Sequence, residues 1–208
     1  AFTITGTSGT LTRTVGASLD LLSGAEPQRC VELSVFPEDK AIPLQAVADL
    51  WRCADLDDCE DLARRLDELA LIELDLSQGT VRVHDTLRAY MAERLGDASA
   101  VHAGLLDAWG DPHALPYAYA WRSFAYHMRC AGRDDQMEAL LLDPRWLSAK
   151  LAATDVYALI ADCEDVNAIR VLATVRDALR LSAPALVIDP SQWRAQLHAR
   201  LLGVPGPE

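Results

Sequence analysis

Aromatic residues are scarce in this sequence, and long apolar runs are missing from it. Phe, Trp and Tyr make up 6% of the 208 residues, and apolar stretches such as residues 140–142 are short. A membrane-spanning helix needs about 20 consecutive apolar residues, so the sequence predicts no membrane segment. Hydrophobic residues of all kinds still amount to 50% of the chain. This content suffices for one large or two small globular domains with ordinary cores.

Positive charge is the second deficit. The chain has 19 Lys and Arg residues against 31 Asp and Glu residues, which gives a net charge of -12 at pH 7. A field of this sign repels the phosphates of nucleic acids and the surfaces of anionic lipids. We therefore expect neither DNA nor a membrane as a general partner.

The sequence also lacks clustered ligands for a metal ion. Its cysteines are odd in number, irregularly spaced and without a Cys-x-x-Cys pair: Cys30, Cys53, Cys59, Cys130 and Cys163. The histidines other than His84 are equally scattered: His102, His113, His127 and His198. We predict no metal site. Free cysteines, and residues 1–12 without a basic and then apolar leader pattern, favour a reducing, cytoplasmic location.

Motifs of self-sufficient catalysis are absent as well. The chain has no Gly-x-x-x-x-Gly-Lys-Ser/Thr loop to hold nucleotide phosphates. It has neither the Gly-x-Ser-x-Gly turn of many serine hydrolases nor the His-Glu-x-x-His helix of zinc proteases. We expect that this chain alone is not an enzyme and needs no cofactor.

The spacing of apolar residues in the first half predicts helices followed by a hairpin. Val15, Leu19 and Leu22 share a helical face that ends at Gly24. Three further helices are expected at residues 30–36, at 42–51 with Pro43 in the first turn, and at 62–71. Residues 71–84 then alternate as two short strands around a turn at 77–80. This order predicts a winged-helix domain.

The second half shows no strand pattern and predicts an irregular helical bundle. Asp143-Pro144 and Asp189-Pro190 are typical N-cap and first-turn pairs. Two apolar helix faces are predicted, one of Val166, Ile169, Leu172, Val175 and Leu179, the other of Trp193, Leu197 and Leu201. No fixed period relates the helices, which disfavours a solenoid of repeats.

The expected fold class is therefore mainly α, in two domains. We assign residues 1–12 to a tail or linker, 13–95 to the winged-helix domain, 96–203 to the helical domain and 204–208 to a linker. Helical spacing also predicts that all tryptophans pack in the core rather than stack on a ligand: Trp51, Trp109, Trp121, Trp146 and Trp193.

Many winged helices bind DNA, but the charges here disfavour that function. The expected recognition helix region, residues 55–70, holds seven carboxylates against Arg64 and Arg65. The hairpin offers Arg82 against Glu73 and Asp75. A helix that enters the major groove needs side chains that donate to base edges and tolerate phosphates. The acidic residues are better explained as a solvated helix start.

Several short motifs carry a resemblance to a known family. They are residues 34–39 (Ser-Val-Phe-Pro-Glu-Asp), Leu50-Trp51 and, after the hairpin, Val83-His84-Asp85. Together they resemble the winged-helix segment of NB-ARC (AP-ATPase) signalling NTPases. This STAND class includes the apoptotic protease-activating factor, plant disease-resistance proteins and bacterial members with WD-repeat propellers. Residues 101–109, 126–151 and 196–203 are similar to the helical domain that precedes the propeller in bacterial members.

The resemblance implies a regulatory role inside a larger nucleotide switch. The winged helix would fold back on the protein's own upstream nucleotide-binding domain, which holds ADP or ATP with Mg, and would keep the protein closed. By motif match, His84 would reach the β-phosphate of ADP, and Asp85 would support its orientation. Val83 stands where the family usually has Met and would be apolar packing. The helical domain would connect to a downstream WD-repeat propeller, and the activated parent would form a homo-oligomer.

Other interpretations of the same residues remain open at this point. The alternative for His84 is an ordinary hydrogen-bonded histidine at a strand-to-helix junction, although the phosphate role is preferred. The chain as a whole also fits a free-standing protein-protein interaction module that never meets nucleotide. A winged-helix transcription regulator is the second alternative.

Overall fold

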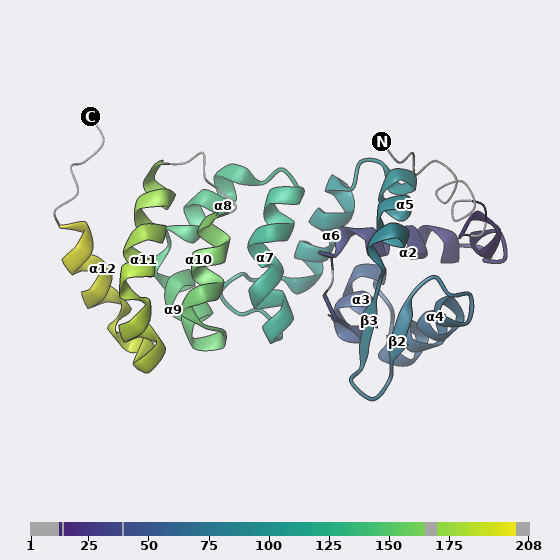
Figure 1. Cartoon of the computed structure of the whole chain (residues 1–208), viewed down its shortest axis with the longest axis horizontal. Helices are drawn as coiled ribbons and strands as arrows, with labels where there is room; N and C mark the ends of the chain where they lie inside the picture. Colours follow the sequence, from purple (N-terminus) through teal and green to yellow (C-terminus); the bar gives the residue numbers. More distant parts are fainter. Residues whose placement is uncertain (1–12, 14, 39, 165–169, 203–208) are drawn as a thin grey trace, which may run out of the picture. The chain divides into compact units, whose positions relative to one another are not determined.

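A computed structural model describes residues 13, 15–38, 40–164 and 170–202. The described chain is mainly helical and has a small three-stranded antiparallel sheet, which confirms the mainly α fold class. Its contacts divide it into two compact units, residues 1–108 and 109–208 (Figure 1). The sequence predicts the division after residue 95, whereas the contacts group most of helix α6 (Ser99–Trp109) with the first unit. The predicted tail at 1–12 and the linker at 204–208 lie outside the described residues.

The N-terminal unit alternates helices with the three strands. A helical segment at residues 15–19 buries Val15 and Leu19, and Gly24 follows at a φ of 58° that favours glycine. The elements after it are α2 (Glu26–Glu32), the 3-10 helix η1 (Leu33–Val35), β1 (Ile42–Pro43), α3 (Leu44–Trp51), α4 (Leu56–Glu68), β2 (Glu73–Asp75), β3 (Thr80–Arg82), α5 (Asp85–Leu95) and α6.

The start of the helix predicted at residues 42–51 is wrong. Ile42 and Pro43 form strand β1, which pairs with β3 and places Ile42 opposite Val81. Pro43 has a ψ of 138°, so it is extended, and α3 begins one residue later at Leu44. The fixed φ of proline suits an extended strand as well as a first helical turn. The resulting sheet order is β1-β3-β2.

Further boundaries differ from the prediction. The helix expected at 62–71 is α4, which begins earlier, at Leu56, and ends earlier, at Glu68. The helix expected at 30–36 is divided into α2 and η1, and Phe36 is extended ahead of Pro37 because proline disfavours a helical residue before it. The hairpin turn occupies residues 76–79 rather than 77–80. The carboxylate of Asp75 accepts hydrogen bonds from the backbone N–H groups of Ser77 and Gln78 and so begins the turn early.

Helix α4 explains most of the acidic run at its start. Asp55 is the N-cap, and its carboxylate accepts a hydrogen bond of 2.9 Å from the backbone N–H of Asp58. Asp57 and Asp58 lie in the first turn, where negative charge interacts favourably with the helix dipole, and all three residues are exposed. The solvated interpretation of these residues agrees with this geometry.

The described residues of the C-terminal unit contain helices and no strand, as predicted. The elements are α7 (Ala118–Cys130), α8 (Asp134–Leu141), α9 (Pro144–Ala153), α10 (Val156–Glu164), α11 (Arg170–Ile188), η2 (Pro190–Gln192) and α12 (Trp193–Leu201). Asp143 caps α9 and Asp189 caps η2 through their carboxylates, which confirms both N-cap predictions. In Figure 1, α11 lies beside α10 on one side and α12 on the other.

Most residues of the predicted apolar helix faces, and all tryptophans, are buried in the structure. Leu172, Val175 and Leu179 are buried on α11, whereas Val166 and Ile169 lie outside the described residues. On α12, Trp193 and Leu197 are buried and Leu201 is half-buried. All tryptophans are at most 9% exposed, which confirms their core assignment: Trp51, Trp109, Trp121, Trp146 and Trp193. Over the parts of the chain that the structure describes, no helix has the length and hydropathy that crossing a membrane requires.

A charged pair lies inside the C-terminal unit. The ammonium group of Lys150 on α9 contacts the carboxylate of Asp162 on α10, and Lys150 is fully buried. Burial lowers the pKa of Lys150, and the neighbouring carboxylate opposes that effect. The ammonium group also lies 5.3 Å from the ring centroid of Trp146. Because one charge would be left buried without its partner, neither member of this pair can be removed alone without a large energetic cost.

We therefore expect Lys150→Met to destabilise the C-terminal unit by about 3–5 kcal/mol, because Asp162 then keeps a buried charge without its counter-ion. The double variant Lys150→Met/Asp162→Leu should recover most of that loss. Urea denaturation followed by tryptophan fluorescence measures both, since all tryptophans except Trp51 lie in this unit. A single variant as stable as the native chain would contradict the assignment.

The N-terminal unit buries a titratable group of its own. His102 on α6 is 4% exposed, and burial lowers its pKa to about 4 from an ordinary value of 6.5. The native state therefore disfavours the protonated imidazole. Between these two pH values the unfolded chain binds a proton at His102 that the folded chain does not.

This difference predicts a loss of stability on acidification. As the pH falls from 6.5 to 4, His102 should reduce the free energy of unfolding by roughly 2–3 kcal/mol, with little further change below pH 4. His102→Gln should show a smaller loss over this range. His198→Gln, which changes an exposed histidine, is the matched control and should keep the native pH profile. Urea denaturation at pH 7, 5.5 and 4 makes the comparison.

Candidate functional site

Residues 83–85 lie at the junction between β3 and α5. Val83 is 5% exposed and packs in the core, whereas the His84 side chain is 63% exposed. Asp85 is the first residue of α5 and is exposed. The alternation of the strand continues through the junction, which places the apolar side chain inside and the imidazole on the surface.

The imidazole of His84 contacts a carboxylate across the hairpin. Its Nε2 lies 2.7 Å from Oε1 of Glu73 on β2. Because a carboxylate can only accept, Nε2 carries the proton and donates. The register of β2 and β3 pairs Glu73 with Arg82, which brings the Glu73 side chain close to the residue that follows β3 by two positions. Both side chains are more than half exposed, so their contact has a small effect on stability.

His84 is the N-cap of α5 through its backbone alone. Its φ of -65° and ψ of 141° are extended, and its carbonyl accepts a hydrogen bond of 2.8 Å from the N–H of Arg88. The side chain makes no capping hydrogen bond. Asp85 lies in the first turn, where a carboxylate interacts favourably with the helix dipole. Within the described residues, the carboxylate bonded to His84 is Glu73, which sequence reasoning did not identify.

One arginine joins the first of the motifs that carry the family resemblance to helix α5. The Nε of Arg88 on α5 donates a hydrogen bond of 2.9 Å to the backbone carbonyl of Phe36. The same guanidinium lies 3.4 Å from the carboxylate of Glu38. Segment 34–38 is thus attached to the helix that follows His84, although about fifty residues separate them in the sequence.

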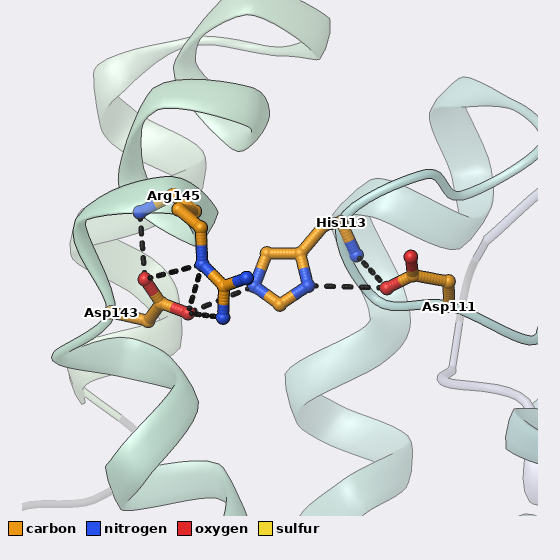
Figure 2. A network of polar contacts seen from close by, with 4 residues as sticks. All are labelled: Asp111, His113, Asp143 and Arg145. Atoms are coloured by element: carbon orange, nitrogen blue, oxygen red, sulfur yellow. Dashed lines mark hydrogen bonds and ion pairs between the residues drawn. The ribbon is translucent and has the colours of Figure 1, made fainter.

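A second polar cluster lies in the C-terminal unit (Figure 2). The imidazole of His113 lies between two carboxylates, with Nδ1 3.1 Å from Asp111 and Nε2 2.9 Å from Asp143. Arg145 also contacts Asp143, and its hydrogen bonds hold the pKa of that carboxyl well below its usual range. The cluster attaches the segment before α7 to the start of α9. We interpret it as a structural contact, because Asp143 is at the same time the N-cap of α9.

The remaining candidate ligands do not form a metal-binding group in the described part of the chain. No group of three or more His, Cys, Asp or Glu side chains there has the arrangement to hold a metal ion. His102 and His127 are buried, and His198 is exposed on α12.

Comparison with known proteins adds no relative to these observations. No protein-family model matches the sequence, and no curated protein matches it.

The geometry of the junction predicts different roles for neighbouring residues. Val83→Ala should lower the free energy of unfolding by roughly 1–3 kcal/mol, because it removes two buried methyl groups. His84→Ala should change it by less than about 0.5 kcal/mol, because an exposed pair contributes little. Chemical denaturation followed by circular dichroism compares the two. A large loss of unfolding free energy for His84→Ala would show that this histidine stabilises the fold, and would contradict its assignment as an exposed side chain available for contacts.

Proposed function

We propose that this chain is the regulatory part of a nucleotide-dependent signalling switch of the NB-ARC (STAND) type. In this proposal the N-terminal unit is a winged-helix domain that helps to hold ADP and the closed state. The helical C-terminal unit connects it to a downstream sensor, such as a WD-repeat propeller. The nucleotide and its Mg would be bound mainly by an upstream domain, and the parent protein would act in the cytoplasm and oligomerise on activation.

The order of elements supports a winged helix. α2, β1, α3, α4 and the β2-β3 hairpin follow one another as helix, strand, two helices and two strands. The first strand joins the sheet beside β3 rather than β2. This connection brings both ends of the α3-α4 pair to the sheet, as a winged helix requires.

The single observation that carries the proposal is the presentation of His84. A group that contacts a phosphate on another domain must be exposed, must carry a donor N–H and must be held by a rigid support. His84 is 63% exposed, and its Nε2 donates to Glu73. Val83 beside it is buried in the core, and α5 begins at the next residue. These features match what the resemblance implies for Val83 and His84, whereas the carboxylate that contacts the imidazole is Glu73 rather than Asp85.

The surface charge of α4 disfavours DNA as a partner of this helix. The first turns of α4 expose Asp55, Asp57, Asp58 and Asp61. Arg64, farther along the helix, is already paired with Glu60. A DNA-reading helix would have to bring these carboxylates close to the phosphates, which is electrostatically unfavourable.

The proposal predicts that His84→Ala weakens ADP retention in the intact parent protein. The variant should copurify with less ADP than the native protein and shift toward the oligomer, because the closed state loses a contact that the open state lacks. Nucleotide content by chromatography and mass by light scattering measure the two effects. His198→Ala changes an exposed histidine on α12 and is the matched control. Equal ADP content and equal mass in native protein and His84→Ala would refute the proposed role.

The sequence upstream of this segment is an independent test. A strand, a Gly-x-x-x-x-Gly-Lys-Ser/Thr loop and a helix encoded there would supply the missing phosphate-binding site. A stop codon or an unrelated domain in that place would leave a free-standing interaction module as the better function.

A further inference from the structure

His113 contacts a carboxylate through each of its two ring nitrogens. Its Nδ1 lies 3.1 Å from Oδ1 of Asp111, and its Nε2 lies 2.9 Å from Oδ2 of Asp143. In Figure 2 the ring lies between Asp111 on one side and Asp143 with Arg145 on the other. Asp111 belongs to the same segment as the histidine, residues 110–117 between α6 and α7, whereas Asp143 is the N-cap of α9. The ring therefore attaches this segment to the start of α9.

The two contacts together require two N–H donors on the ring. An ionised carboxylate can only accept hydrogen bonds. A neutral imidazole carries one N–H and one lone pair, so it can donate to Asp111 or to Asp143 but not to both. The imidazolium carries both protons and satisfies both contacts. The observed geometry is therefore that of the protonated ring.

Both carboxylates stay ionised near neutral pH. The backbone N–H of His113 donates to Oδ1 of Asp111 at 2.9 Å, and this bond lowers the pKa of Asp111. The hydrogen bonds from the side chain and backbone of Arg145 lower the pKa of Asp143. Neither carboxylate takes up a proton in the range in which histidines ordinarily titrate, about pH 5 to 8. The ring proton is therefore the one that changes in this range.

Few charged groups surround the ring. Among the described residues, the ion pairs of His113 are those with Asp111 and Asp143, and Arg145 is the cation beside Asp143. The guanidinium repels a protonated ring, while the two carboxylates attract it. The His113 side chain is 26% exposed, so water weakens these interactions only in part. The protonated ring thus faces one more negative charge than positive charge.

Loss of a ring proton leaves no stranded charge at Asp143. Its carboxylate still accepts from the backbone N–H of Arg145 at 2.8 Å, from Nη2 at 2.9 Å and from Nε at 3.2 Å. Asp111 is less free to move, because its Oδ1 also accepts from the backbone N–H of His113. A neutral ring in the observed place would turn a lone pair toward one of the two carboxylates. The ring must therefore rotate away.

We propose that His113 is a pH-sensitive switch, which holds residues 111–114 against the start of α9 as an imidazolium and detaches them when it loses one ring proton. The bound proton stabilises the attachment, so the attachment is complete at low pH and is lost as the pH rises. This direction is opposite to that of His102 in the N-terminal unit. The carbonyl of Leu115 accepts from Nε1 of Trp121 at 3.1 Å, which involves no titrating group and limits the change to the residues before it.

Hydrogen exchange in the folded 208-residue chain tests the proposal. The backbone N–H groups of His113 and Ala114 are bonded to the carboxylate and the carbonyl of Asp111, so their protection reports on this segment. After correction for the intrinsic exchange rate at each pH, their protection should fall about three- to ten-fold between pH 5.5 and pH 8.5. Amides inside α9 should keep their protection over the same range.

Two variants separate the ring proton of His113 from other effects of pH. His113→Gln has no ring proton to lose, so the protection of Ala114 should be the same at both pH values. His198→Gln changes an exposed histidine on α12 and should keep the native fall. Equal protection at pH 5.5 and pH 8.5 in the native chain, or an equal fall at Ala114 in His113→Gln, would overturn the proposal. The native chain alone yields the first result, so a misfolded variant does not affect it.

Discussion

The position of His84 depends on the pairing of β3 with two neighbouring strands. Val81 pairs with Ile42 of β1 and with Leu74 of β2, and it is 1% exposed. Since side chains alternate along a strand, Val83 returns to the buried face and His84 points to solvent. A shift of one residue would bury the imidazole and expose the valine. The same register brings Glu73 to the imidazole, so one set of strand pairs determines the whole junction.

Features that depend on neighbouring residues could be predicted from the sequence, whereas contacts that depend on tertiary structure could not. The Asp-Pro caps of α9 and η2 and the buried faces of α11 and α12 depend on neighbouring residues and were predicted. β1 was missed because a strand of two residues has no period to detect. The contact of His84 with Glu73 depends on strand register, and that of His113 with Asp143 joins residues 30 positions apart. Neither spacing corresponds to a motif.

The two units use polar side chains in different ways. In the N-terminal unit, His84 and Glu73 form an exposed pair that contributes little to stability. In the C-terminal unit, Lys150 and Asp162 are buried and link α9 to α10, while His113 joins the segment before α7 to the start of α9. A buried ion pair favours one arrangement of its two helices because other arrangements leave a charge unpaired.

The carboxylate of Glu73 would compete with a phosphate for the N–H of His84. The donor N–H that a phosphate would use is already bound to a carboxylate at 2.7 Å. An incoming anion gains only the difference between its own bond to His84 and the bond it displaces. A small anion with no other contacts therefore has little advantage over Glu73. In the proposed switch, a nucleotide anchored by the upstream domain would complete the exchange, and Glu73 would set a threshold that excludes weakly held anions.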